Sequence, residues 1–537
     1  MSDAIFITTY SAEWGPIDEL GVGYIAAVLE RSGYVTAIRR LLDKDNKAIR
    51  ALGEELAHMA TPRLVGLACS HRTPDLSTLK QLCEVVKRVA PSTHITAGGY
   101  WASFNYKNLL RALRDLDSVV VGEGEIALVA LMDHLRGARE WRTVPGIVTR
   151  AVRCTAAPLV RDLDSLPIPV RSPPERAGDH LVSISTSRGC MAHCTFCNVP
   201  AWMRQFGGAA WRGRSSRGVV DEMAHLIAAL KVHRFWIVDS SFEDPLPEGL
   251  QRMRSIATDI LTRRLNLRYY TFHRAESIAR LFSEELLALL RQSGLRRVFI
   301  GVESATDIIL KAFAKPSRKQ DIASALDRLT AAGLAVRCGF IMFTPESTAE
   351  SLLNNVKFLR ERNLLFSTTD LFTRLELYSG TAEVETLRKQ GLLRDDFWRN
   401  PYAYRFLDER AEWLAEAICP LRRRLSQTAD WEILHNADLI ATSARLDQRV
   451  MEDCRLAVKV RDFCDELTDI KEMVSQNNET FMREAVNLAW GNRKPAAIQQ
   501  LIEKHIVGFH VPASQTVRMI AIEFLLGIRS VFADFIY

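Results

Sequence analysis

The first 145 residues alternate short β-rich runs with amphipathic helical segments, a pattern that few folds accommodate. The runs at 4–10, 64–70, 94–99 and 118–121 are rich in apolar and β-branched residues, and a helical segment follows each of them. Strands that alternate with helices in this order indicate a parallel sheet with helices on both faces. We therefore predict a doubly wound, Rossmann-like α/β domain over residues 1–145.

Three further regions follow. Prolines in residues 146–180 remove backbone donors and disfavour helix, so we predict a linker or an extended crossover there. Six more strand-like runs with helical segments between them lie in residues 181–385, the last of them at 367–378, which predicts a partial (β/α)6 barrel. Residues 386–537 lose the strand pattern and repeat apolar residues at helical spacing, so this C-terminal domain should be mostly helical.

Charge and composition argue against nucleic acid, membrane insertion and secretion. A net charge of +6 over 537 residues is mild, and no basic stretch is interleaved with stacking aromatics. No apolar run reaches the ~20 residues that span a bilayer, and no signal-peptide pattern opens the chain. The ten cysteines are scattered apart from one group of three, which is typical of a reduced, cytoplasmic protein.

The group of three is Cys190, Cys194 and Cys197, a C-x-x-x-C-x-x-C motif that follows a predicted strand. A redox pair of Cys194 and Cys197 would leave Cys190 without a role. A structural zinc site needs four ligands, usually from two paired motifs, and no second C-x-x-C or H-x-x-H occurs. His193 would be the nearest candidate for a fourth ligand. A four-iron cluster on three thiolates uses all three cysteines and leaves one iron open to a chelating ligand, and we favour it.

With Phe196 directly before its last cysteine, this motif resembles that of the radical S-adenosylmethionine (SAM) enzymes. The resemblance implies that Cys190, Cys194 and Cys197 hold a [4Fe–4S] cluster and that SAM chelates its open iron. It also implies an electron donor such as flavodoxin or ferredoxin, and a 5′-deoxyadenosyl radical made by one-electron cleavage of SAM. Phe196 matches the aromatic residue whose backbone contacts the adenine of SAM.

The resemblance continues along the barrel, with two departures. Residues 236–244 and 299–305 match strands that end in an acidic residue, the second as Gly-x-Glu-Ser. The run 343–347 lacks the glycine of the usual Pro-Gly-Glu turn, and Ser379 replaces the proline of a later Pro-Gly-Thr turn.

Polar side chains end several of the predicted barrel strands. Active sites of such barrels lie at the carboxyl ends of the strands, and a sulfonium with a ribose diol needs carboxylate or hydroxyl partners. Each side chain taken singly could instead cap a helix or join a buried ion pair, but their recurrence on successive strands favours a site. The predicted SAM contacts beside Phe196 are Asp239, Arg274, Glu303 and Ser304.

Polar, glycine-rich turns follow three strands of the first domain. Cofactors of doubly wound folds bind outside the carboxyl ends of the strands, where glycine allows a bulky ligand to approach the backbone. Ahead of a radical SAM barrel, this arrangement resembles the cobalamin-binding domain of the cobalamin-dependent radical SAM enzymes. The resemblance implies cobalamin contacts from Ser70, His71, Arg72, Thr73, Gly98, Gly99, Tyr100, Gly122, Glu123, Gly124 and Glu125.

The sequence lacks the Asp-x-His-x-x-Gly motif that brings a histidine onto cobalt in many cobalamin proteins. Trp101 stands where a histidine usually follows the Gly-Gly turn. We therefore expect cobalamin to bind with its own base displaced and no histidine beneath the cobalt. His71 and Arg72 are the candidates for its lower face, and a phosphate or amide contact or plain solvent exposure are open alternatives for both.

These observations lead to the hypothesis of a cobalamin-dependent radical SAM methyltransferase. The resemblance implies that a methyl group moves from SAM through methylcobalamin to an unactivated carbon of a small-molecule or peptide substrate. A first alternative is a rearrangement, cyclisation or ring contraction on the same scaffold, without methylation. A second, from another class, is a non-catalytic iron–sulfur or zinc-binding protein, against which the strand-end glycines and Glu303 argue.

Overall fold

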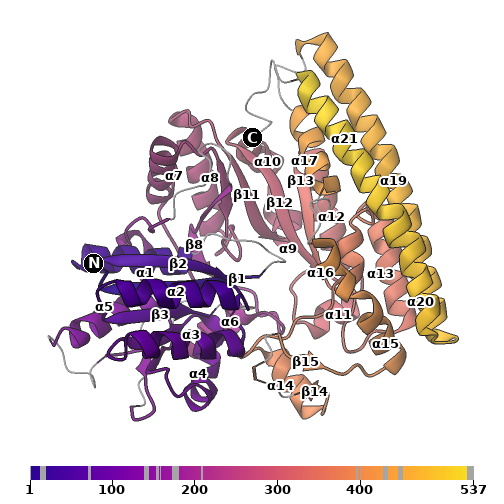
Figure 1. Ribbon diagram of the computed structural model, residues 1–537. Helices are drawn as coiled ribbons and strands as arrows, with labels where there is room; N and C mark the ends of the chain where they lie inside the picture. The colour runs from indigo at the N-terminus through magenta and orange to yellow at the C-terminus, as the bar shows by residue number, and fades with distance from the viewer. Residues whose placement is uncertain are drawn as a thin grey trace. The chain divides into compact units, whose positions relative to one another are not determined.

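The computed structural model comprises two compact units. The first contains Met1–Glu175, Ser183–Glu222 and Glu376–Ala403; the second contains Arg176–Val182, Met223–Leu375 and Tyr404–Tyr537 (Figure 1). The predicted domain boundaries at 145, 180 and 385 stay predictions. The structure describes residues 2–11, 20–69, 74–137, 144–152, 157, 159–171, 181–206, 210–394, 397–398, 401–426, 433–445 and 452–528.

The first unit contains a six-stranded sheet in the order β2-β1-β3-β4-β5-β6. Strands β1 to β5 pair in parallel, and only the edge strand β6 is antiparallel to its neighbour. The strands are β1 (Ala4–Tyr10), β2 (Thr36–Leu42), β3 (Leu64–Ala68), β4 (His94–Gly98), β5 (Ser118–Val120) and β6 (Ile147–Val148). The helices between them are α1 (Leu20–Arg31), α2 (Asn46–His58), α3 (Leu76–Val89), α4 (Tyr100–Ala112) and α5 (Gly124–Leu135).

The alternating direction of the β1 side chains shows why helices cover both faces of this sheet. Ile5 and Ile7 belong to one buried core, with side chains of α2, α3 and α4, whereas Ala4 and Phe6 belong to another, with α1 and α5. Because successive strand side chains point to opposite faces, an all-apolar strand needs a cover on each side. The predicted doubly wound fold is confirmed.

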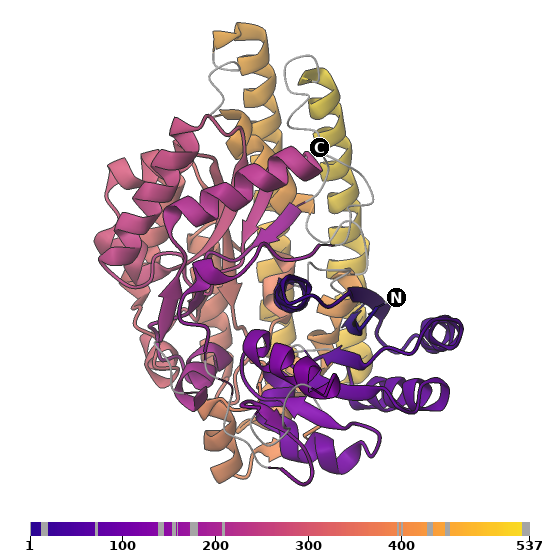
Figure 2. The same cartoon turned by 90° about the vertical axis from the view of Figure 1, so that its left-hand side faces the viewer.

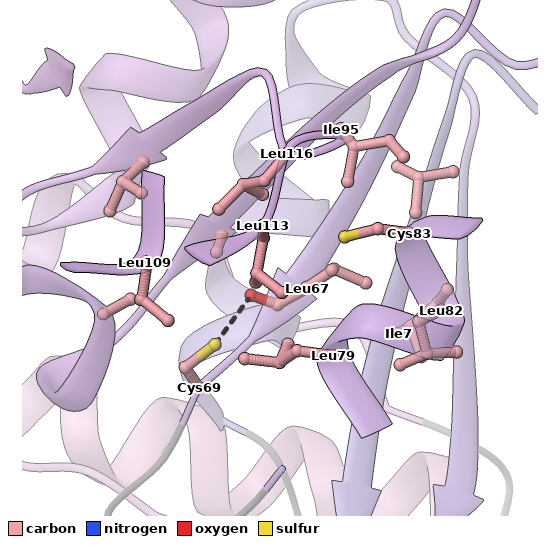
Figure 3. Close-up of a cluster of buried hydrophobic side chains, with 14 of the residues drawn as sticks. Ile7, Leu67, Cys69, Leu79, Leu82, Cys83, Ile95, Leu109, Leu113 and Leu116 are labelled. Atoms are coloured by element: carbon pink, nitrogen blue, oxygen red, sulfur yellow. Dashed lines mark hydrogen bonds between the residues drawn. The ribbon is translucent and has the colours of Figure 1, made fainter. Parts of the chain in front are cut away.

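Cys69 and Cys83 lie in the first of these cores, beside Leu67 and Leu79 (Figure 3). The Cys69 thiol contacts the Leu67 carbonyl at 3.7 Å. Burial raises the pKa of the Cys69 thiol, and it raises that of Cys83 to about 12. Both side chains therefore stay protonated at neutral pH and act as apolar filling rather than as metal ligands.

The remainder of the first unit brings in segments from far along the chain. A small antiparallel sheet of two strands flanks the cysteine motif, and a helix follows it. These elements are β8 (Ser187–Gly189), β9 (Trp211–Gly213), α6 (Asn198–Phe206), the start of α7 (Ser216–Leu230), α14 (Ala382–Lys389), β14 (Leu393–Arg394) and the short turn η2 (Leu163–Ser165).

The second unit is built on parallel strands β10 to β13, in a five-stranded sheet of order β13-β12-β11-β10-β7. The strands are β7 (Leu181–Ile184), β10 (Arg234–Ile237), β11 (Arg268–Arg274), β12 (Leu295–Glu303) and β13 (Ala335–Phe340). The helices that alternate with them are α8 (Glu248–Thr262), α9 (Ala275–Leu281), α10 (Glu284–Gln292), α11 (Asp307–Ala312), α12 (Lys319–Ala331) and α13 (Ala349–Glu361).

One run expected as a barrel strand, residues 367–378, is not a regular strand. It begins with the 3₁₀ helix η3 (Thr368–Phe372) and then makes an isolated parallel bridge between Arg374 and Phe343. The Asp370 amide donates to the Ser367 carbonyl at 3.0 Å, and the Thr373 hydroxyl donates to the Asp370 carbonyl at 2.8 Å. These local hydrogen bonds compete with a strand ladder, as serine, threonine and aspartate commonly do.

The C-terminal part is helical, as predicted. The 37-residue helix α19 (Cys454–Trp490) runs beside α21 (Val511–Ile528) in both views (Figures 1 and 2), and Phe463 stacks on Phe524 with ring centroids 4.2 Å apart. None of the helices in the described ranges combines the length and the apolar run that a membrane crossing requires. The other elements here are α15 (Glu409–Ile418), α16 (Pro420–Ser426), α17 (Ile433–Arg445), α20 (Pro495–Ile502), the π-helix η4 (Glu503–His510) and β15 (Ala403–Tyr404).

Candidate functional site

The three-cysteine loop starts from the β8–β9 hairpin. The Cys190 amide donates to the Ala210 carbonyl at 3.0 Å, and Gly189 before it has φ +103°, where a Cβ would collide with that carbonyl. Only glycine fits this left-handed, close-packed position. The Ala192 amide lies 3.4 Å from the Cys190 sulfur, and an N–H directed at sulfur favours the thiolate.

The far end of the loop is anchored on the Rossmann-like domain. Helix α6 follows Cys197 directly, and its Trp202 ring lies 4.4 Å from the Tyr100 ring and 6.1 Å from Phe104 of α4. Burial, and next the charge of Cys197, raises the pKa of Tyr100 to about 12. The thiol loop and the turn that begins α4 therefore belong to the same part of the first unit.

That turn is Gly98–Gly99, between β4 and α4. Gly99 has φ +105°, and a Cβ there would collide with the Cys69 carbonyl at the end of β3. Gly99 thus serves the close packing of two strand ends, whereas a Cβ on Gly98 would meet nothing nearer than Val120 at 3.5 Å. Trp101 is 3% exposed, which places the residue that replaces the usual histidine in the core.

The third glycine-rich turn contacts arginines that flank the cysteine loop. Arg188 on β8 lies 3.2 Å from Glu123 and 2.7 Å from Glu125, and Arg212 on β9 lies 2.7 Å from Glu123. The Val160 amide also donates to Glu123 at 2.7 Å. Burial would raise the pKa of Glu123, but the Arg212 hydrogen bond and both guanidinium charges outweigh it and lower that pKa.

A segment from much later in the chain closes over the same loop. Glu383 of α14 accepts a hydrogen bond from the Thr195 hydroxyl at 2.9 Å, and its amide donates to the Thr195 carbonyl at 3.1 Å. Ser379, the residue in place of the family's proline, accepts from the Asn105 side chain at 2.7 Å and donates to the Tyr402 hydroxyl at 3.2 Å. A proline has no hydroxyl for these bonds, so this departure has a local structural use.

In the second unit, the predicted Asp239 and Arg274 both lie in ion pairs. Asp239 is buried and 3.7 Å from Arg252. Arg274 ends β11, where its guanidinium contacts Glu243 at 3.3 Å, Glu276 at 3.6 Å and also Asp244. Arg274 thus lies at a strand end, but three carboxylates occupy its guanidinium, and its contact with SAM stays a prediction.

Glu243 and His273 complete this charged group, and sequence reasoning did not single them out. The two side chains are 2.9 Å apart, and the other ring nitrogen of His273 lies 2.9 Å from the Thr271 hydroxyl. Burial would raise the pKa of Glu243, but His273 and then Arg274 lower it to about 2. The signal was available, because Glu243 follows the 236–241 run and His273 precedes Arg274.

Glu303 and Ser304 lie at the end of β12 but have different partners. Glu303 has φ +63°, an uncommon conformation for a residue with a side chain, and its carboxylate lies 3.0 Å from Lys315. Ser304 lies within 3.3 Å of the Thr306 hydroxyl and accepts from the Thr306 amide, as helix-entry serines do. The geometry suits Glu303 for a ligand contact better than Ser304.

Two family models match the chain. The model of the radical SAM superfamily matches residues 184–359, and that of the B12 binding domain matches residues 14–132. The chain is a radical SAM protein with a B12-binding domain. Its cofactors are accordingly SAM, a [4Fe–4S] cluster and cobalamin, in agreement with the expectation from the sequence.

Relatives of this radical SAM protein include a methyltransferase and a cyclase. An uncharacterised methyltransferase of Pyrococcus horikoshii is 25% identical over 397 residues, which are 71% of this chain and 80% of the relative. The anaerobic magnesium-protoporphyrin IX monomethyl ester cyclase of Rubrivivax gelatinosus is 26% identical over 363 residues, 64% of this chain and 62% of the relative. The solved cobalamin-dependent SAM radical enzyme OxsB shares the fold, with a TM-score of 0.66 at 18% identity over 100% of this chain and 81% of OxsB.

The donor set of the radical SAM protein suits its cluster. Three thiols on one loop, with an amide directed at the first sulfur, are the ligands that iron–sulfur clusters take. Within the described ranges, no three acidic, histidine or cysteine side chains converge on the site of a single metal ion. A four-iron cluster gives each thiolate its own iron, so the ligands of a cluster need not converge in this way.

The carboxyl edge of the Rossmann-like sheet has polar groups that suit cobalamin. The Thr8 hydroxyl and the Trp101 indole nitrogen are buried and lack a partner among the described residues. An unpaired buried polar group costs about 1–3 kcal/mol, which the amides of a bound corrin would offset. The predicted contacts Ser70, His71, Arg72 and Thr73 lie outside the described residues.

Proposed function

We propose that the protein is a methyltransferase that moves a methyl group from SAM to an unactivated carbon of its substrate. The cluster with SAM would supply the radical that activates this carbon, and cobalamin would carry the methyl group. The observation that carries the proposal is the packing of the thiol loop on the B12-binding domain, through Trp202 on Tyr100 and through Arg188 and Arg212 on Glu123. A reaction that uses both cofactors needs both held in one compact unit.

The residues divide the work as follows. Cys190, Cys194 and Cys197 bind the cluster, and Phe196 lies beside the adenine of SAM. In the second unit, Glu303 has Lys315 at 3.0 Å, so its carboxylate charge is partly balanced, and a contact of Glu303 with SAM stays a prediction. Gly98, Gly99 and Tyr100 form the edge that meets cobalamin, as do Gly122 and Gly124. Glu123 contacts Arg188 and Arg212, and Glu125 contacts Arg188. Through these arginines the two glutamates hold the strands that flank the cysteines.

Counting the products of SAM tests the methyl transfer. Methylation consumes one SAM to S-adenosylhomocysteine and one to 5′-deoxyadenosine, so repeated turnover with substrate should yield the two in equal amounts. The measurement is anaerobic incubation of the reconstituted enzyme with methyl-labelled SAM and an extract of the source organism, followed by chromatography. 5′-Deoxyadenosine without repeated S-adenosylhomocysteine, and without label in an extract component, would favour the radical cyclisation suggested by the Rubrivivax relative.

The state of the bound cobalt gives a second prediction. We expect cobalamin to bind with its base displaced and with no histidine nitrogen on cobalt, because the Gly-Gly turn is followed by Trp101. An indole N–H is a donor only and cannot coordinate a metal. The cobalt(II) paramagnetic spectrum should therefore show cobalt lines without nitrogen triplets. Triplets that disappear in His71→Ala would contradict this expectation.

A further inference from the structure

Three aromatic side chains line one face of the second sheet, on neighbouring strands. Trp236 of β10, Phe272 of β11 and Phe299 of β12 form this aromatic row. The Trp236 and Phe272 ring centroids are 5.8 Å apart with the planes 24° from parallel, and those of Phe272 and Phe299 are 4.9 Å apart. Strands lie about 4.8 Å apart, so a row over three strands is about 10 Å wide.

The two faces of this sheet differ in how they are covered. On β12, Val298, Ile300 and Val302 are at most 1% exposed. The residues between them, including Phe299, are only partly buried, and β11 alternates in the same way around Phe272. A parallel sheet is normally covered on both faces, and large aromatic side chains in its middle are normally buried. The side with the aromatic row therefore has ring surface available to a further group.

Polar groups bound the aromatic row at both ends of the strands. Toward the amino ends, Arg297 donates to the His435 carbonyl of α17 at 3.1 Å, which brings a helix over that end. Toward the carboxyl ends, Arg274 follows Phe272 by two residues on the same face of β11. On β12, the Glu303 carboxylate lies against Gly301, where a Cβ would come within 2.6 Å of it.

The glycines at this end add no side chains of their own beside the row, although the Lys315 ammonium, like the Glu303 carboxylate, lies within 2.6 Å of where a Cβ on Gly301 would be. Gly301 and Gly339 are paired across β12 and β13, and a Cβ on Gly339 would come within 3.0 Å of the Phe299 ring. Neither strand therefore places a side chain between the aromatic row and Glu303. The Phe272 and Phe299 ring planes are tilted by 49° to each other. An apolar, aromatic floor with ionic groups at one rim suits a ligand with a planar apolar part and a polar end.

We propose that the aromatic row binds a planar, conjugated ring system of the substrate, with the charged carboxyl ends of β11 and β12 at its rim. This inference rests on the proposed function in taking the substrate as the occupant of the barrel. Stacking explains the choice of a planar group, because aromatic faces gain from offset or tilted contact with another ring beyond the area that they bury. A saturated ring of the same size would bury similar area and lose this gain.

The test compares 2-naphthol with decahydro-2-naphthol, its saturated counterpart, by equilibrium dialysis against the reconstituted holoenzyme. We expect 2-naphthol to bind more tightly than decahydro-2-naphthol to the unmodified protein, a comparison that needs no substitution. Phe272→Leu and Phe299→Leu should each weaken the binding of 2-naphthol by about fivefold and change the binding of decahydro-2-naphthol little. The reason is that leucine keeps the apolar volume and removes the ring. Phe463→Leu, which removes a ring stacked on Phe524, is the matched control and should change neither affinity.

Three binding results would overturn the proposal, and so would one competition result with SAM. The binding results are equal affinity for the two compounds, no binding of 2-naphthol, and an unchanged 2-naphthol affinity in both variants. SAM affinity is measured in parallel, since the adenine of SAM is also planar. If both variants lower the affinity for SAM and 2-naphthol displaces SAM, the aromatic row binds SAM and the substrate assignment is wrong. Dialysis requires no turnover, so a failure of methyl transfer leaves this result standing on its own.

Discussion

Replacing any one of Cys190, Cys194 or Cys197 by alanine is expected to reduce the iron content from about four atoms per chain to near zero. Formation of 5′-deoxyadenosine should stop with it, because the open iron that chelates SAM is lost with the cluster. Iron analysis after anaerobic reconstitution and chromatography of the SAM products measure both effects. Cys454→Ala is the matched control, since Cys454 is exposed at the start of α19.

The buried cysteines sharpen this prediction. Burial raises the pKa of the Cys338 thiol, as it does for Cys69, so both should stay protonated and uninvolved in iron binding. Cys338→Ala and Cys69→Ala should keep the cluster. Loss of iron from Cys338→Ala would identify a fourth protein ligand, which would leave SAM no iron to chelate.

Glu123→Ala is expected to destabilise the protein by about 3–5 kcal/mol, because it leaves the Arg188 and Arg212 guanidinium groups buried together without their shared carboxylate. Arg188 lies on β8, directly before the cysteine loop, and Arg212 lies on β9, which pairs with β8. Loss of Glu123 should therefore also reduce the amount of cluster that the protein retains. Denaturant unfolding and iron content report the two effects separately. Glu55→Ala removes a half-exposed ion pair with Arg39 in the same domain and should cost under about 1 kcal/mol.

The pH dependence of this ion pair follows from the lowered pKa of Glu123. A glutamate whose folded-state pKa is depressed stabilises the protein above its unfolded-state pKa of about 4.3, and this contribution is lost as the pH falls through the folded-state pKa. Acid should therefore destabilise the unmodified protein more than Glu123→Gln. Parallel acid titrations of the two would contradict the assignment of the ion pair.

Local sequence patterns were sufficient for the architecture. Apolar alternation in β1, with Ile5 and Ile7 on one face and Ala4 and Phe6 on the other, follows from a periodicity of two and requires helices on both sides. The cysteine spacing within eight residues likewise pointed to a cluster without knowledge of distant contacts. Such features depend on neighbours along the chain, so they can be interpreted before the fold is known.

Several features depended on the tertiary structure because their partners are far apart in sequence. Glu123 and Arg212 are 89 residues apart, and Asn105 and Ser379 are 274 apart, so no local pattern pairs them. Residues 367–378 have strand-like composition, yet hydrogen bonds around Ser367 and Asp370 form a 3₁₀ helix there. The aromatic row likewise exists only through the register of β10, β11 and β12, which places Trp236, Phe272 and Phe299 on one face. The apolar pattern of the sequence predicts which residues are buried. Only the packed sheet determines which distant residue lies beside each of them.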